Sequence, residues 1–393
     1  MGLSIERIEI LLFIAAIVAI LTRRLKLPYS VGLVITGAGL AFLPFNLDIS
    51  MTKEMIFTVL LPPLIFEAAL FLSWQEVRKE FPIVLSMATI GVAIAAVVTA
   101  AGMHYFANWP WISAALFGAL IAATDPVSVI ATFKEAELKG RIRTLVETES
   151  LFNDGTAAVM FSALIAIAQG AEISSLNIAT NLFFTIGGGV ACGALVALVL
   201  LYLTGKTEDH LVEMTFTTIV AYGSFLLAEH FHFSGVLATL TAGLVFGNMR
   251  SIGNLTNKGR ESIEAFWEYA AFVANSLIFL LIGIREVKQN FSGIWMLALL
   301  AIGLVMLGRV LAVYPICLLF SKTSLRIKLP DQHILFWGGL RGALALALAL
   351  GLPDDVPYDG QIVTITFAVV AFSIIIQGIT ITPFLRYLKV LNS

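Results

Sequence analysis

The residues most able to do chemistry in this sequence are charged side chains inside long apolar stretches. An ionisable side chain within a membrane span is unfavourable unless it is paired or hydrated, so such a residue is a candidate for function. Six residues meet this description: Glu67, Asp125, Glu149, Asp154, Arg309 and Arg341. Their neighbours in the sequence indicate how they could act.

Two of these residues, Glu149 and Asp154, belong to the sequence ESLFND, whose helical periodicity sorts its polar groups onto two faces. Ser150 and Asp154 are four residues apart and project together, so one face offers a hydroxyl and a carboxylate to an ion. Glu149 and Asn153 share the adjoining face. A buried Glu requires a partner, and Arg309 is the natural candidate inside the bundle. We therefore expect Glu149 and Arg309 to form a structural ion pair.

Asp125 lies where a proline should interrupt a helix, in the sequence Thr124-Asp125-Pro126. Pro126 fits the first turn of a second half-helix, whose positive N-terminus favours an ionised carboxylate. Carbonyls freed at the end of the first half-helix can ligate a cation. Small hard cations prefer oxygen ligands, and an all-oxygen set is available. We predict a site for a small cation formed by Asp125, Asp154, Ser150 and Thr124.

The two aspartates also predict how transport could be coupled. Burial and a neighbouring carboxylate both favour the protonated form of a carboxylic acid. A site of this kind holds either a cation or a proton, and that competition alone couples their movements. The sequence contains no GxxxxGK[ST] loop for ATP. We expect no cofactor beyond the transported ions.

The elements that must position these residues are membrane-spanning helices. Of the 393 residues, 59% are hydrophobic and only 13% are charged, a balance outside that of soluble domains. The formal net charge of −2 leaves no basic surface for nucleic acid. A bilayer core of ~30 Å requires about 20 apolar residues of helix. Thirteen apolar segments result, at approximately 8–22, 30–45, 55–72, 82–106, 111–132, 145–169, 177–204, 211–229, 234–249, 262–284, 291–320, 331–352 and 361–385.

The distribution of basic residues predicts the orientation of these segments. Most of the 24 Lys and Arg residues fall in alternate loops, which the positive-inside rule places in the cytoplasm. We predict a multi-pass protein of the plasma membrane with its N-terminus outside and its C-terminus in the cytoplasm.

Two segments carry interruptions near their centres: the fifth at Asp125-Pro126, and the twelfth at the glycine-rich GGLRG of 338–342. Segments five and twelve run in opposite directions because they are an odd number apart. A pair of interrupted segments in matching positions points to the midplane site of a transporter. We predict an all-α polytopic membrane protein with two inverted six-helix repeats, whose broken helices 5 and 12 cross at the midplane. No repeat is visible in the sequence itself.

At these residues the chain resembles the NhaP-type sodium/proton antiporters, which are related to the animal sodium/proton exchangers in the monovalent cation:proton antiporter superfamily. The resemblance spans nearly the whole chain, and the order of ATDP, ESLFND and GGLRG is highly specific. The shared sequences are LLPPLIFEAAL (60–70), ATDPVSV (123–129), ESLFNDG (149–155), SGVLATLTAGLVFG (234–247), the GRV around Arg309, and FWGGLRGA (336–343).

The resemblance implies an assembly and a division of the chain. It implies a homodimer of thirteen-span protomers that works by alternating access. In each protomer a core domain of about 82–169 and 291–385 would move against a dimerisation domain of about 8–72 and 211–284. A linker helix at about 177–204 would connect the two. The chain ends soon after the last span, so no cytoplasmic regulatory domain is expected.

The resemblance also implies roles for residues around the ion. Asp125 and Asp154 would carry the ion and the proton. Ser150 and Thr124 would contribute ligands, and Asn153 would fix the broken helices. In this family an Asn-Asp pair in the sixth span goes with electroneutral exchange, and this sequence has Asn153-Asp154.

The remaining candidates are implied to support the site. Glu149 and Arg309 would form the core ion pair. Glu67 would lie close to the ion, and Arg341 would steady the crossing at span 12. Exchange of Na⁺ or Li⁺ for H⁺ is then the expected function.

Three alternatives follow from the same residues. An intramembrane aspartyl protease also needs two aspartates within spans, but the sequence lacks GxGD, GxSxG and HExxH, so we expect no enzyme. A channel is disfavoured because there is no TVGYG-like filter. A K⁺/H⁺ antiporter of the same fold stays open, because ligand type does not separate Na⁺, Li⁺ and K⁺.

Overall fold

The computed structural model is entirely helical over the residues that it describes, which are 5–25, 27–42, 55–125, 133, 140–170, 175–249, 256–288, 293–353, 355–388 and 390. The first part of the chain forms α1 (Ile5–Leu25), α2 (Tyr29–Leu40), η1 (Met55–Leu60), α3 (Leu61–Phe71), α4 (Trp74–Ser86), η2 (Met87–Gly91), α5 (Val92–Ala107), α6 (Trp111–Ala122) and α8 (Arg141–Ala168). The rest forms α9 (Ser175–Thr204), α10 (His210–His230), α11 (Gly235–Asn248), α12 (Asn257–Lys288), α13 (Trp295–Leu319), α14 (Leu329–Trp337), α15 (Ala343–Leu350), α16 (Asp359–Phe372), η3 (Ser373–Gln377) and α17 (Gly378–Tyr387). The elements η1, η2 and η3 are short π-helical stretches.

The length and composition of these helices are those of a multi-pass membrane protein. In the described part of the chain, seven helical stretches are long and apolar enough to cross a membrane: Trp74–Ala107, Arg141–Ala168, Thr180–Thr204, His210–His230, Lys258–Arg285, Trp295–Leu319 and Asp359–Tyr387. Four shorter apolar stretches accompany them: Tyr29–Leu40, Met55–Phe71, Trp111–Ala122 and Gly235–Asn248. The predicted all-α membrane architecture is confirmed, whereas the count of thirteen spans stays a prediction.

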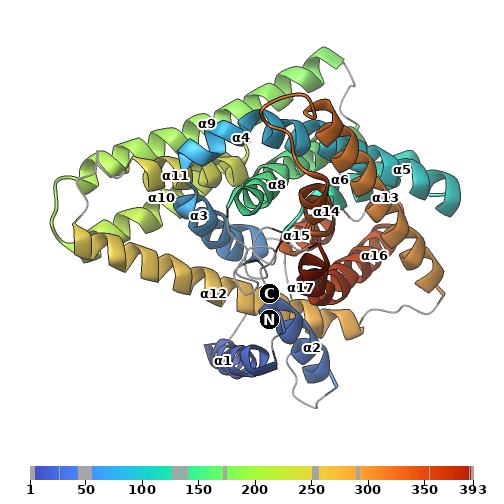
Figure 1. Ribbon diagram of the computed structural model, residues 1–393, viewed down its shortest axis with the longest axis horizontal. Helices are drawn as coiled ribbons and strands as arrows, with labels where there is room; N and C mark the ends of the chain where they lie inside the picture. The colour runs from blue at the N-terminus through green and yellow to red at the C-terminus, as the bar shows by residue number, and fades with distance from the viewer. Residues whose placement is uncertain are drawn as a thin grey trace.

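The helices gather on two sides of the molecule (Figure 1). Helices α9, α10 and α11 lie on the left of the view, and α5, α13 and α16 lie on the right. Helices α3, α8 and α15 lie between these groups, where α3 packs on α11 and α15 packs on α6. Helix α12 runs obliquely across the lower half of the view, above α1 and α2, and packs on α2. The candidate residues lie in the middle of this arrangement.

Two short helices end inside the protein at the predicted interruptions. Helix α6 has 12 residues, so at 1.5 Å per residue it extends about 18 Å, clearly less than the ~30 Å of a bilayer core. It ends at Ala122, and the chain continues in an extended conformation at Ala123. Pro126, to which the sequence assigned this interruption, lies outside the described residues. The second interruption is present between the end of α14 at Trp337 and the start of α15 at Ala343.

Candidate functional site

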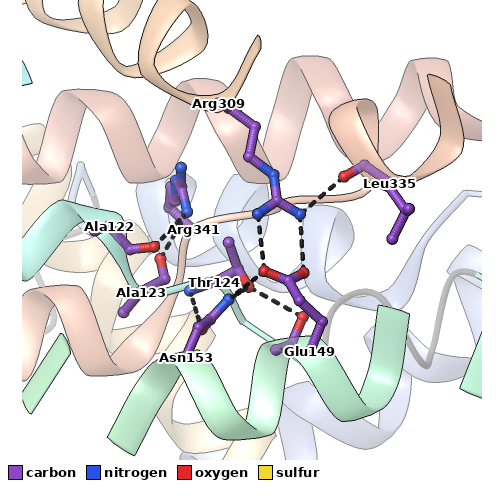
Figure 2. Close-up of polar contacts among 9 residues, drawn as sticks. Ala122, Ala123, Thr124, Glu149, Asn153, Arg309, Leu335 and Arg341 are labelled. Atoms are coloured by element: carbon purple, nitrogen blue, oxygen red, sulfur yellow. Dashed lines mark hydrogen bonds and ion pairs between the residues drawn. The ribbon is translucent and has the colours of Figure 1, made fainter. Parts of the chain in front are cut away.

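The site is built where the end of α6 meets the interruption between α14 and α15. The backbone N–H of Asp125 donates to the carbonyl of Leu340 at 2.7 Å. The Nη1 atom of Arg341 donates to the carbonyls of Ala122 at 2.9 Å and Ala123 at 3.0 Å. Carbonyls at the end of a helix have no partner within it and carry partial negative charge. The buried guanidinium of Arg341 therefore completes the C-terminus of α6 and joins the two interrupted segments (Figure 2).

Hydrogen bonds tie the same segment to α8. The amide oxygen of Asn153 accepts from the backbone N–H of Thr124 at 3.0 Å, and its Nδ2 donates to Thr124 Oγ1 at 2.5 Å. Thr124 Oγ1 donates in turn to Ser150 Oγ at 3.0 Å. Asn153 Nδ2 also donates to Glu149 Oε1 at 2.9 Å (Figure 2). Asn153 thus connects Thr124, a predicted cation ligand, with Glu149 of the neighbouring ion pair.

That ion pair joins α8 to α13. Arg309 Nη1 donates to Glu149 Oε1 at 2.8 Å, and Arg309 Nη2 donates to Glu149 Oε2 at 2.9 Å. The Nη2 atom also donates to the carbonyl of Leu335, in the last turn of α14 (Figure 2). Glu149 is fully buried and Arg309 is 6% exposed. A charge this deep is tolerated when its geometry is bidentate and it is hydrogen-bonded, as it is here.

The two aspartates line one small cavity of about 20 Å³, which is room for about one water-sized particle. Both side chains are buried, Asp125 at 8% and Asp154 at 4% exposure. Among the described residues, Asp154 Oδ1 has no hydrogen-bond partner. The other lining residues are Leu61, Leu64, Ile65, Ala123, Thr124, Gly342, Ala343, Leu344 and Ala345. A buried carboxylate oxygen without a partner, beside a cavity of this size, can be satisfied by a proton or by a small cation.

Nearly all the residues singled out in the sequence meet at this crossing. Two predicted ion ligands do not line the cavity: Ser150, which is hydrogen-bonded to the lining residue Thr124, and Glu67, whose helix α3 contributes Leu61, Leu64 and Ile65 instead. The Glu67 side chain is half-buried. The structure therefore gives Glu67 a place near the cavity and no direct part in its wall.

Gly342 also lines the cavity, although the sequence analysis assigned it no part in the site. A Cβ atom at this position would stand 2.5 Å from Asp125 Cγ. The run GGLRG was interpreted only as an interruption of a helix, and nothing in the sequence shows which of its glycines faces Asp125. Gly342 is needed for the close approach of the backbone to that carboxylate.

The comparisons with known proteins cover nearly the whole chain. Residues 10–387 match the family described as sodium/hydrogen exchanger, transmembrane. The low-affinity Na⁺/H⁺ antiporter NhaS1 of a Synechocystis species is 39% identical over 96% of this chain and 73% of its own. The Na⁺/H⁺ antiporter NhaH of Halobacillus aidingensis is 34% identical over 97% of both chains.

A comparison of structures gives the same fold. The sodium proton antiporter MjNhaP1 of Methanocaldococcus jannaschii superimposes with a TM-score of 0.77 over 99% of each chain, at 21% sequence identity. Identity at this level shows the fold alone. The family implied by the sequence motifs is confirmed, and so is an antiporter-like helical fold, whereas the two inverted repeats stay a prediction.

Proposed function

The chain belongs to the family of transmembrane sodium/hydrogen exchangers, and on that premise we propose that it is an antiporter that exchanges Na⁺ or Li⁺ for H⁺. The relatives described above are Na⁺/H⁺ antiporters, which are transporters and not enzymes. The observation that carries the proposal is Asp154 Oδ1, which has no hydrogen-bond partner in the described part of the chain and lies beside a cavity that Asp125 also lines. One occupant at a time, a proton or a cation, satisfies these two carboxylates.

The ligands of the cation are proposed to come from both interrupted and continuous helices. Asp125 and Asp154 supply carboxylates at the cavity, and Thr124 and Ser150, which are hydrogen-bonded to each other, supply hydroxyl oxygens. Asn153 holds Thr124 in place, so that its hydroxyl stays at the end of α6. This all-oxygen set suits small hard cations.

The buried charges of the crossing support exchange of one Na⁺ for one H⁺. Among the described residues, three buried acids and two buried bases gather here: Asp125, Glu149, Asp154, Arg309 and Arg341. When all are ionised, negative charge exceeds positive charge by one. A single H⁺ or a single Na⁺ therefore makes the cluster neutral, and an unneutralised buried charge is strongly unfavourable. The cluster is then neutral whenever the site changes the side of the membrane it faces, whether it holds Na⁺ or H⁺. Exchange is therefore electroneutral.

The remaining parts of the proposal concern the whole protomer. We propose thirteen spans in two inverted repeats, a homodimer, and a core of about 82–169 and 291–385 that moves against a scaffold of about 8–72 and 211–284. The N-terminus lies outside and the C-terminus lies in the cytoplasm, across a plasma membrane. The thirteen apolar segments, the excess of basic residues in alternate loops and the resemblance to NhaP-type antiporters support these statements.

The proposed exchange is tested in proteoliposomes with an imposed pH gradient. Na⁺, Li⁺ and K⁺ are added in turn, and the collapse of the gradient is followed by a pH-sensitive dye. Na⁺ and Li⁺ should collapse the gradient. Liposomes without protein give the rate at which the gradient collapses by passive leak. If none of the three cations collapses the gradient faster than the leak, the antiporter proposal is wrong. Collapse by K⁺ alone would make the chain a K⁺/H⁺ antiporter.

A further inference from the structure

We propose that Ser373 and Gln377, two polar residues of η3, are positioning residues for the ion site because they hold the peptide group that aligns Asp125. This inference rests on the proposed function, since it assigns them a part in ion affinity. Neither residue lines the cavity of the two aspartates. They act through the backbone between α14 and α15.

One peptide group connects Ser373 to Asp125. The N–H of Arg341 donates to Ser373 Oγ at 2.8 Å. The carbonyl of Leu340, which belongs to the same planar peptide, accepts from the N–H of Asp125 at 2.7 Å. The plane cannot rotate without breaking both bonds. The hydroxyl of Ser373 therefore sets the direction of the carbonyl that holds the backbone of Asp125.

The same residue, Arg341, also holds the chain just before Asp125. Its guanidinium donates to the carbonyls of Ala122 and Ala123 (Figure 2). A displacement of the backbone at Arg341 would therefore move the end of α6 through two further bonds. The position of Ser373 is therefore transmitted through the Leu340–Arg341 peptide and the Arg341 side chain to Ala122, Ala123 and Asp125.

Gln377 fixes Ser373 and the end of α14 together. Ser373 Oγ donates to Gln377 Oε1 at 2.7 Å. Gln377 Nε2 donates to the carbonyl of Trp337, the last residue of α14, at 3.3 Å. Ser373 and Gln377 are only 1% and 2% exposed, so water does not supply these bonds. The π-helical turn that carries both side chains is the kind of local irregularity often found at functional sites.

Ser373 and Gln377 line a second cavity, distinct from that of the two aspartates. Its lining includes Arg309, Gly339, Arg341, Ser373 and Gln377, and it shares no lining residue with the cavity of the aspartates. Ser373 and Gln377 therefore have no direct contact with the cavity of the aspartates. A residue in this place changes ion affinity only by changing geometry.

The test compares Ser373→Ala with Thr366→Val, a matched loss of a buried hydroxyl in the same span. Thr366 is fully buried and donates to Ile362 of its own helix at 2.7 Å, away from the crossing. Ser373→Ala should raise the half-saturating Na⁺ concentration roughly tenfold, because the buried N–H of Arg341 loses its acceptor. Thr366→Val should leave that concentration within about twofold. Ser373→Thr keeps the hydroxyl and should restore wild-type affinity.

A second measurement does not depend on transport. Hydrogen–deuterium exchange followed by mass spectrometry reports the backbone N–H of Asp125, which should exchange faster in Ser373→Ala than in wild type or Thr366→Val. Gln377→Leu, which leaves the Ser373 oxygen in place, should raise the half-saturating concentration less than Ser373→Ala. Gln377→Leu also tests the inference if Ser373→Ala does not fold.

The outcomes separate this inference from the proposed function. Wild-type protein that exchanges Na⁺, together with unchanged affinity and unchanged amide exchange in both η3 variants, would overturn the positioning role. A lower melting temperature alone, with both of those readouts unchanged, would make the two residues merely structural and would overturn it as well. If wild-type protein does not exchange Na⁺, the proposed function is wrong, and amide exchange at Asp125 still decides whether Ser373 positions it.

Discussion

At the scale of residues, the two aspartates differ in how the protein holds them. The backbone of Asp125 is anchored to Leu340, whereas Asp154 projects from the continuous helix α8 with one oxygen unpartnered among the described residues. The two side chains meet at one cavity. Each therefore supplies a charge that the other cannot replace.

We predict that Asp125→Asn and Asp154→Asn each abolish Na⁺/H⁺ exchange and leave the protein folded. The amide keeps the shape of the side chain but can neither bind a proton at the relevant pH nor neutralise Na⁺. Proton flux in proteoliposomes and the elution profile in detergent check the two halves of this prediction. Cation-dependent flux near the wild-type level in either variant would remove that aspartate from the carrier role.

The Glu149–Arg309 pair should matter for stability. Glu149→Ala or Arg309→Ala leaves one buried charge unpaired, which costs about 3 to 5 kcal/mol in soluble proteins. As a control, Arg260→Ala breaks the i,i+4 pair with Glu264, in which the Arg260 side chain is 62% exposed, and should cost less than about 1 kcal/mol. Thermal unfolding of the purified protein measures both. Equal melting temperatures for the buried and exposed variants would contradict the structural role of the pair.

At the scale of elements, the crossing depends on the close approach of two interrupted segments. Glycine at position 342 allows the chain that precedes α15 to lie against Asp125. The hydrogen bond from Asp125 to Leu340 and the contacts of Arg341 then fix the distance between the segments. The cavity wall is thus made by backbone as much as by side chains.

We predict that Gly342→Ala displaces Asp125 and raises the half-saturating Na⁺ concentration by at least roughly tenfold, because the new Cβ overlaps the carboxyl group. Gly303→Ala in α13 is the matched control, since a Cβ there has nothing within 4 Å. The half-saturating concentration is read from the collapse of the pH gradient at several Na⁺ concentrations. Equal values for the two variants would show that Asp125 is not held as described.

The interruptions could be predicted from the sequence, but their contacts could not. The glycine run of 338–342 indicated where a helix ends, because glycine is a poor helix former. The i,i+4 spacing in ESLFND likewise indicated the faces of Ser150 and Asp154. The bond from Arg341 to Ser373 joins residues 32 positions apart, and no local periodicity encodes it. Ser373 and Gln377 looked like ordinary polar residues in an apolar segment.

At the scale of the whole molecule, the excess of one negative charge among the buried acids and bases of the crossing predicts transport that does not respond to voltage. Exchange rates should stay constant when the membrane potential of proteoliposomes is set to several values with K⁺ and valinomycin. A protein-free preparation corrects for leak. A rate that rises steeply with voltage, or a steady current on a solid-supported membrane, would mean that more than one proton moves for each Na⁺.

Composition predicted that the chain is a membrane protein, but it did not show where the individual helices end. The apolar segment 111–132 is long enough to read as one span, yet the described helix within it ends at Ala122 after 12 residues. Hydropathy averages over the interruption, because Thr124 and Asp125 are surrounded by apolar residues. The proline indicated an interruption near Asp125, but hydropathy alone could not show that the helix ends at Ala122.

The central claim is that Na⁺ and H⁺ compete for the same two carboxylates, and the dependence of Na⁺ affinity on pH tests it most directly. Exchange is measured in proteoliposomes at a series of pH values, with a full Na⁺ titration at each. Protons occupy the shared site as the pH falls, so the half-saturating Na⁺ concentration should rise towards low pH while the maximal rate at saturating Na⁺ changes much less. A half-saturating concentration that stays constant across the series, with only the maximal rate changing, would mean that the two ions bind at separate sites and would contradict the account.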